Sequence, residues 1–263
     1  MDIKKILFLL VTVCSFLTLY GQKVHELVSP DHTIRVEITV SDGIYYDVFC
    51  KEHLLLKHGT LQMQMDDKTL GLHPKLIGKK SKTVNEFLKP VVPFKFSTIT
   101  NHYNQLLLNF RGNYSVEFRV FDDGIAYRLI TDKKGEVEVS LPEEYLLHVQ
   151  QSDGFKTAYE EPYSHLRPDE WNRSADKYTL LPVLIEAKDN YKILISESDL
   201  ADYPAMFLTS KGGKDKLTSV FPRNPIEFGE DGDRSVKLLK EAGYLAKTRG
   251  KRNFPWRYFV ITS

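Results

Sequence analysis

The chain has 263 residues, a formal net charge of +1 and a hydrophobic fraction of 42%. A chain of this length and composition can bury a sizeable core, which excludes an intrinsically disordered protein. The balanced charge provides no long-range field for nucleic acid, and no sustained basic patch with interleaved aromatic residues is present, so we expect no nucleic-acid partner.

The first 21 residues have the pattern of a cleaved signal peptide. Residues 1–5 contain two lysines. The mostly apolar run that follows, residues 6–20, is too short for a comfortable transmembrane span. Cleavage after Gly21 would leave a domain of residues 22–263, with no stable membrane insertion and a periplasmic or secreted location. Cys50 would then be the last remaining cysteine, so no internal disulfide is expected. A membrane anchor or a buried N-terminal helix is the alternative interpretation.

The mature chain is predicted to consist of strands separated by turn residues. Polar and apolar residues alternate with period two over Thr33 to Val40, and Asp42-Gly43 favours a hairpin turn into residues 44–49. Further strands are predicted, in chain order, at residues 106–110, 114–121, 125–130, 137–141, 180–186, 191–196, 207–208, 217–221 and 258–261. Residues 235–244 fit a short helix or a strand pair equally well. Many strands at short spacing, without long alternating helices, predict an all-β sandwich or barrel.

Two segments between the predicted strands have the composition of loops. Residues 75–82 are basic and contain glycine, which predicts an exposed loop. Residues 155–178 form a long polar and aromatic segment, and long ordered loops are often functional. Its acids and aromatic residues are candidate ligand contacts, namely Glu160, Glu161, Tyr163, His165 and Trp171. A loop packed by its own aromatic side chains is the alternative.

Glu197 is a candidate ligand for a hard cation. It lies at the end of a predicted strand and is followed by Asp199 and Asp202. Calcium takes about six to eight oxygen ligands, which carboxylates in such a cluster could provide. No EF-hand spacing is present, and a solvated turn is the alternative. Farther along the chain, Trp256 and Arg257 are expected to be structural, with Trp256 anchoring a core or interface and Arg257 in an ion pair or a cation–π contact.

Four motifs in order along the chain resemble the N-terminal domain of glycoside hydrolase family 97, a family of calcium-dependent α-glycosidases. The motifs are Ser29-Pro30-Asp31, the segment FRVFDDGIAYR at residues 118–128, Glu197-Ser198-Asp199-Leu200 followed by Tyr203-Pro204, and Phe254-Pro255-Trp256-Arg257. The resemblance implies an all-β fold, an antiparallel β-super-sandwich of the mutarotase-like type. Ala205 departs from the family pattern, which has glycine after this proline.

The resemblance also implies the roles of individual residues. It implies that the acids and aromatic residues of the long segment, Glu160, Glu161, Tyr163, His165 and Trp171, line a sugar subsite. In the family, the glutamate at the position of Glu197 reaches the catalytic barrel and joins barrel glutamates around calcium. Calcium is therefore expected only where a barrel completes the site. The acid and the base or nucleophile come from the barrel, so no catalytic residue is expected here. Glu160 and Glu161 are a poor catalytic pair, because neighbouring residues of an extended chain point to opposite sides.

Together these features predict a catalytically incomplete, carbohydrate-facing domain of an α-glucosidase-like enzyme from a Gram-negative bacterium. Its expected partners are an α-linked oligosaccharide and a separately encoded catalytic barrel. Two alternatives remain: a stand-alone carbohydrate-binding module, and a fragment without function that exposes an apolar patch where a barrel once docked. The residues do not discriminate a glucoside from a galactoside, or inverting from retaining chemistry.

Overall fold

The structure, a computed structural model, describes residues 23–141, 147–148, 153–156, 162–167, 170–171, 178–210, 216–233 and 235–263. These residues form mainly β-strands, together with a short 3₁₀ turn, η2 (Lys188–Asn190). The strands are β1 (Lys23–Val28), β2 (Ile34–Val40), β3 (Ile44–Cys50), β4 (His53–Thr60), β5 (Met63–Met65), β6 (Lys68–Leu70), β7 (Leu76–Leu88), β8 (Ile99–Phe110), β9 (Tyr114–Phe121), β10 (Gly124–Leu141), β11 (Leu147–His148), β12 (Asp153–Lys156), β13 (Ser164–Leu166), β14 (Val183–Glu186), β15 (Lys192–Ser198), β16 (Phe207–Thr209), β17 (Lys216–Val220), β18 (Pro225–Asp231), β19 (Ser235–Glu241), β20 (Ala246–Asn253) and β21 (Trp256–Thr262).

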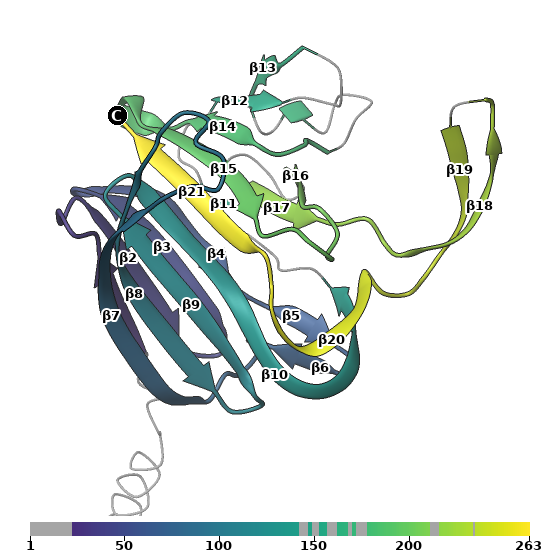
Figure 1. The fold of residues 1–263 in the computed structure, drawn as a ribbon, viewed down its shortest axis with the longest axis horizontal. Helices are drawn as coiled ribbons and strands as arrows, with labels where there is room; N and C mark the ends of the chain where they lie inside the picture. Colours follow the sequence, from purple (N-terminus) through teal and green to yellow (C-terminus); the bar gives the residue numbers. More distant parts are fainter. Residues whose placement is uncertain are drawn as a thin grey trace, which may run out of the picture.

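The strands form two packed antiparallel sheets and a separate hairpin (Figure 1). The large sheet has twelve strands, with the central order β14-β15-β21-β10-β9-β8-β7. The small sheet has seven, in the order β1-β2-β3-β4-β11-β17-β16, and it lies behind the large sheet in Figure 1. The two remaining strands, β18 and β19, pair only with each other. The predicted all-β antiparallel sandwich is confirmed. Within the described part of the chain, no helix has the length and apolarity to cross a membrane.

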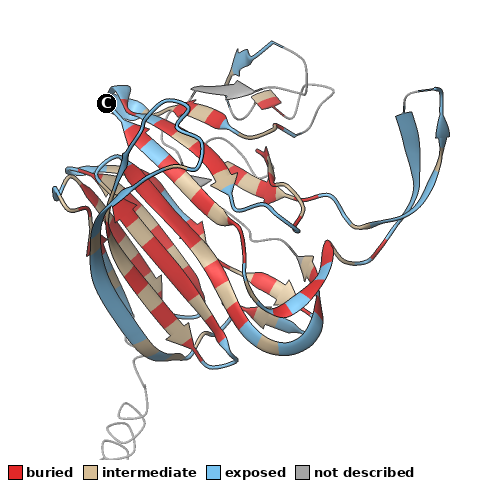
Figure 2. Cartoon of the chain, viewed as in Figure 1, coloured by how far each residue is buried: buried red, intermediate tan, exposed pale blue. Residues whose placement is uncertain are grey.

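The core lies between the two sheets, where strand alternation directs every second side chain. In β2 and β3 the burial pattern alternates strictly between buried and half-buried residues. Rings from the two sheets meet across this interface: the ring centroid of Tyr46 lies 5.9 Å from that of Phe118 and 5.3 Å from that of Tyr127. Figure 2 shows the buried residues concentrated along the central strands of both sheets. This shared core makes the two sheets one folding unit.

Most predicted strands are present, and three predictions need correction or completion. Residues 75–82, predicted as an exposed loop, belong largely to edge strand β7. The sequence pattern failed there because β7 is exposed on both faces and lacks apolar alternation. Residues 235–244, left open between helix and strand, contain strand β19. Residues 125–130 and 137–141 are parts of one long strand, β10.

Two hairpins project beyond the sandwich. The β7–β8 ribbon continues past the end of β9, because residues 99–103 of β8 pair only with β7. We call residues 84–103 the finger and its end, residues 87–99, the tip. The β18–β19 hairpin, residues 225–241, is called the arm. Figure 2 shows both as largely exposed, with the finger at the upper left and the arm at the right.

Candidate functional site

Glu197 and Arg257 form a buried ion pair between two neighbouring strands of the large sheet. They face each other in the β15–β21 register, and Arg257 Nη1 lies 2.7 Å from Glu197 Oε2. The other carboxylate oxygen, Oε1, accepts a hydrogen bond of 3.0 Å from the Met206 N–H. The side chains are only 1% exposed for Arg257 and 9% for Glu197. The ion pair expected for Arg257 is confirmed, and its guanidinium also lies 5.3 Å from the ring centroid of Phe221.

The surroundings of Glu197 do not fit a calcium ion by themselves. Burial raises the pKa of its carboxyl group, and the charge of Arg257 and the Met206 N–H oppose that rise. Both carboxylate oxygens already have partners, one of them cationic. The described residues contain no group of three or more His, Cys, Asp or Glu side chains that could hold a metal. A ligand role for Glu197 thus stays a prediction that applies only when further oxygen ligands come from outside these residues.

Of the five residues predicted to contact a sugar, the structure describes three: Tyr163, His165 and Trp171. Glu160 and Glu161 lie outside the described residues. Tyr163 is 58% exposed, and His165 on β13 lies with Nε2 3.2 Å from Glu186 Oε2. Trp171 is buried, and its indole N–H donates to the Leu166 carbonyl at 3.1 Å. Tyr163 and His165 are accessible to a ligand, whereas Trp171 is buried and bonds to β13. The sugar-binding role of all five residues stays a prediction.

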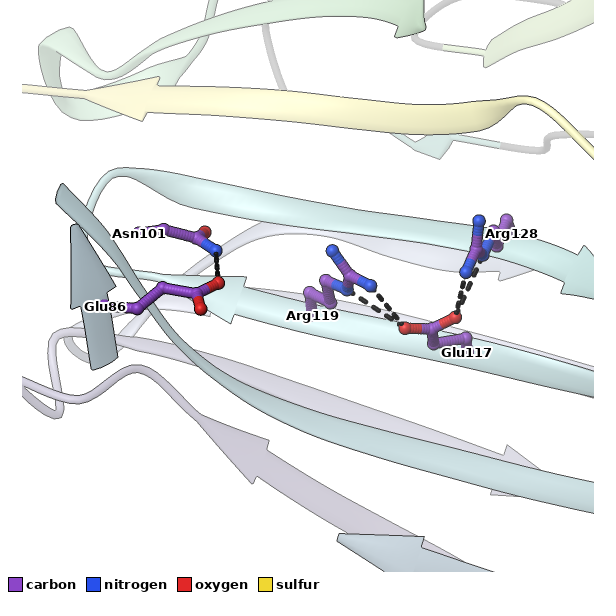
Figure 3. Close-up of polar contacts among 5 residues, drawn as sticks. All are labelled: Glu86, Asn101, Glu117, Arg119 and Arg128. Carbon is purple, nitrogen blue, oxygen red and sulfur yellow. Dashed lines mark hydrogen bonds and ion pairs between the residues drawn. The ribbon is translucent and has the colours of Figure 1, made fainter. Parts of the chain in front are cut away.

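A second polar cluster lies on the outer face of the large sheet, the face away from the small sheet (Figure 3). Glu117 on β9 is almost fully buried and accepts hydrogen bonds from two arginines. Arg119 donates its Nε and Nη2 to Oε1 at 3.0 and 2.9 Å. Arg128 on β10 donates its Nε to Oε2 at 2.9 Å and places Nη2 2.8 Å from it. One carboxylate therefore orients two guanidinium groups, and the cluster keeps one net positive charge.

Trp256 lies within this arginine cluster. The guanidinium carbons of Arg119 and Arg128 are 4.3 and 4.2 Å from its ring centroid. Such cation–π contacts hold planar guanidinium groups in place. Arg119, Trp256 and Tyr258 border a pocket of about 350 Å³ on the same face. The expected anchoring role of Trp256 agrees with these contacts.

Sequence reasoning missed this cluster as a site. The residues were visible only as part of the FRVFDDGIAYR motif, and their convergence depends on strand register. Glu117 pairs directly with Arg128 across β9 and β10, and Arg119 is two residues from Glu117 on the same strand face. A β9–β10 hairpin predicted around the Asp-Asp-Gly turn, with Gly124 opposite Phe121, would have paired Glu117 with Arg128.

Comparison with known proteins shows that the sequence matches a family model and a curated relative. The family model described as "Glycosyl-hydrolase 97 N-terminal" matches residues 27–263. A curated relative, the retaining alpha-galactosidase of Bacteroides thetaiotaomicron, is 33% identical over 99% of this chain and 42% of its own length. The chain thus spans less than half of that relative.

Solved structures show the same fold. A glycoside hydrolase family 97 enzyme from Pseudoalteromonas sp. strain K8, in complex with acarbose, aligns with a TM-score of 0.72 and 20% identity, over 90% of this chain and 35% of that chain. A β-arabinopyranosidase structure aligns with a TM-score of 0.72 and 18% identity, over 90% of this chain and 40% of that chain. These similarities concern the fold, and they cover a minor part of each larger protein.

Proposed function

Since the chain belongs to the glycosyl-hydrolase 97 N-terminal family, we propose that it acts as the carbohydrate-facing β-domain of an α-glycosidase. The family match over residues 27–263 is the observation that carries this proposal. The substrate class is an α-linked oligosaccharide, either an α-glucoside or an α-galactoside. Similarity to a relative named as a retaining alpha-galactosidase supports testing the galactoside beside the glucoside.

The domain alone is proposed to be catalytically incomplete. Hydrolysis of a glycosidic bond requires two carboxyl groups that face each other across the bond, at about 5 Å or 6.5–9.5 Å. The resemblance assigns both groups to a catalytic barrel, and this chain spans 42% of its curated relative. The proposed partner is such a catalytic barrel.

The contribution of this domain is to form one wall of the substrate site. Glu160, Glu161, Tyr163 and His165 would contact the sugar, and the buried Trp171 would hold their segment against β13. Glu197 would join a calcium ion only in the presence of barrel ligands. The periplasmic or secreted location also remains a prediction, since residues 1–21 lie outside the described residues.

The test replaces the matched region of the full-length B. thetaiotaomicron relative with residues 22–263 of this chain. We expect the hybrid to hydrolyse a chromogenic α-galactoside or α-glucoside, and the chain alone to hydrolyse neither. Turnover by the isolated chain would overturn catalytic incompleteness. A cooperatively folded hybrid that hydrolyses no α-glycoside would overturn the glycosidase assignment.

A stand-alone carbohydrate-binding module is the second candidate, and the exposure of Tyr163 supports it. Calorimetric titration of the chain with maltooligosaccharides and α-galactosyl oligosaccharides separates the two functions. Heat that is lost in Tyr163→Ala but not in the exposed control Tyr178→Ala would favour the module. The absence of heat at millimolar sugar would count against it.

A further inference from the structure

A groove lies on the outer face of the large sheet, the face that Figure 1 looks onto. It follows the start of β10, where the chain reads Gly124-Ile125-Ala126. Strand alternation places Ala126 on the outer face, and Gly124 has no side chain. The neighbouring strands β9 and β21 carry larger side chains at these levels: Phe121 and Val260 beside Gly124, and Arg119 and Tyr258 beside Ala126. Two small residues of β10 therefore leave a groove that is one strand wide.

This groove is the pocket of about 350 Å³ that Arg119, Trp256 and Tyr258 border. Its volume is at the lower end for ligand pockets, which measure roughly 300–1,000 Å³. Three half-buried aromatic side chains, those of Phe121, Trp256 and Tyr258, line it. Aromatic rings provide rigid apolar surface, against which the C–H groups of a sugar ring can pack. The pocket therefore suits a ligand of about the size of a single sugar ring.

Arg119 brings an unused hydrogen-bond donor to the pocket. Its Nε and Nη2 both bond to Glu117 Oε1, at 3.0 and 2.9 Å, so Nη1 lies on the opposite edge of the guanidinium group (Figure 3). None of the contacts of the described residues uses this Nη1. The guanidinium carbon lies 4.7 Å from the ring centroid of Tyr103 and 4.3 Å from that of Trp256, which holds the group in place. A guanidinium group oriented in this way is a pre-formed site for a carboxylate oxygen.

The charges around the pocket favour a ligand with a single negative charge. Arg119 and Arg128 share one carboxylate, that of Glu117, which leaves one net positive charge in the cluster. Asp123 lines the pocket at the end near the β9–β10 turn and is exposed. It can accept hydrogen bonds from hydroxyl groups, but it repels a second negative charge. A carboxylate at Arg119, with hydroxyl groups towards Asp123, satisfies both ends of the pocket.

We propose that this pocket binds a pyranose ring that carries one carboxylate group, which is a hexuronate. The carboxylate accepts hydrogen bonds from Nη1 of Arg119, and the ring lies against Trp256 or Tyr258. The proposal goes beyond the glycosidase role. The described residues to which that role assigns sugar contact or calcium, Tyr163 and Glu197 among them, do not line this pocket.

Two other ligands fit the pocket less well. A neutral sugar can pack on the same rings, but it leaves the positive charge of the arginine cluster without a counter-charge. An inorganic phosphate ion neutralises that charge but makes no use of the aromatic walls. Both ligands therefore serve as outcomes of the test.

Calorimetric titration of the chain separates these ligands. D-glucuronate and D-galacturonate are each compared with the neutral sugar of the same ring, D-glucose or D-galactose, and with phosphate at equal ionic strength. We expect at least one uronate to bind saturably, and at least about tenfold more tightly than its neutral sugar, because the neutral sugar lacks the charge-assisted hydrogen bond. Equal binding of the uronate and its neutral sugar would overturn the proposal. Phosphate that binds as tightly as the uronate, or no uronate binding at millimolar concentration, would also overturn it.

Two variants test the pocket itself. Arg119→Gln removes the donor, and Ala126→Leu fills the floor without removing a polar contact. We expect each to weaken uronate binding at least about tenfold, and the Arg119→Gln protein to bind the uronate and its neutral sugar alike. Arg111→Gln, which changes an exposed arginine of the β8–β9 turn, is the matched control and should bind as the wild type does. Thermal melts establish which variants are folded. A folded Arg119→Gln or Ala126→Leu variant with wild-type affinity would contradict the assignment.

Tryptophan fluorescence locates the ligand independently. Trp256 borders the pocket, whereas Trp171 donates its indole N–H to the Leu166 carbonyl and does not line the pocket. We expect the uronate to change the emission of the wild type but not that of Trp256→Phe, which keeps an aromatic wall. An emission change that persists in Trp256→Phe would place the ligand elsewhere and overturn the proposal.

The source of the uronate follows from its trimer. Binding of the trimer as tightly as the monomer would identify the end of an acidic polysaccharide as the ligand. Binding of the monomer alone would identify the free uronate. Both results support the pocket as a uronate site, and they differ only in what delivers the ring.

Discussion

At the residue scale, the Glu197–Arg257 pair ties β15 to β21 inside the sandwich. Removing one partner leaves the other charge buried without compensation, which typically costs about 3–5 kcal/mol. We expect Glu197→Gln to lower the free energy of unfolding by that order, and Glu197→Gln/Arg257→Met to recover most of the loss. Urea denaturation measures both.

The exposed pair between Lys251 and Asp132 is the matched control. Its side chains are 78% and 69% exposed, so Asp132→Asn should change stability by only about 0–1 kcal/mol. An equal effect of Glu197→Gln and Asp132→Asn would contradict a structural role for the buried pair.

Asp31 determines part of the acid stability of the turn between β1 and β2. Desolvation is the largest single effect on the pKa of its carboxyl group and raises it, but the hydrogen bonds of Ser29, Thr33 and Asp122 together outweigh desolvation and lower the pKa to about 2, from 3.8. Because the folded-state pKa is the lower one, the stabilisation is present above pH 3.8 and is lost as pH falls towards 2. We expect Asp31→Asn to flatten the loss of stability between pH 4 and pH 2 in denaturant titrations.

At the element scale, Gly124 allows β10 to approach β21. A Cβ atom at this position would lie 2.2 Å from the backbone oxygen of Phe259, which flexible side chains cannot relieve. This close approach explains the glycine of the Asp-Asp-Gly turn. We expect Gly124→Ala to destabilise the protein by about 1–3 kcal/mol or more, because the two strands must separate. Gly243→Ala meets no atom within 4 Å and should be nearly neutral in the same thermal melts.

The arm should be the least protected β-structure among the described strands. A two-stranded hairpin is marginally stable alone, and the apolar residues Phe228 and Leu239 are each 54% exposed. We expect the amides of β18 and β19 to exchange at least about 100-fold faster than those of β9, measured by hydrogen–deuterium exchange. Equal protection of the arm and β9 would show that the arm is held by contacts absent from this structure.

Sequence patterns predicted elements where burial differs between the two faces of a strand. Alternation located β2, β3 and β9 because one face of each packs in the core. It missed β7, whose pairing with β8 is made by backbone hydrogen bonds and leaves no apolar pattern. Alternation along one strand could not reveal the arginine cluster either, because the register between β9 and β10 brings Glu117 and Arg128 together.

At the scale of the whole molecule, the motifs predicted the sandwich better than the site. Four motifs in order sufficed for the fold, because each lies at a turn or strand that the sandwich requires. Glu197 was singled out for calcium, yet its partners in the structure are Arg257 and Met206, which no spacing along the chain could reveal.

The shared core predicts that both sheets unfold together. Cys50 is a buried thiol of the small sheet, whereas Trp256 belongs to the large sheet and Trp171 bonds to a residue of it. In a Cys14→Ser background, we expect thiol labelling of Cys50 and tryptophan fluorescence to give the same urea midpoint, because Tyr46 packs against rings of the opposite sheet. A cysteine at the exposed position Glu52, introduced by Glu52→Cys, should react at every urea concentration. Labelling of Cys50 while the fluorescence is still native would mean that the small sheet opens by itself, and that the interface between the sheets is weaker than its aromatic packing indicates.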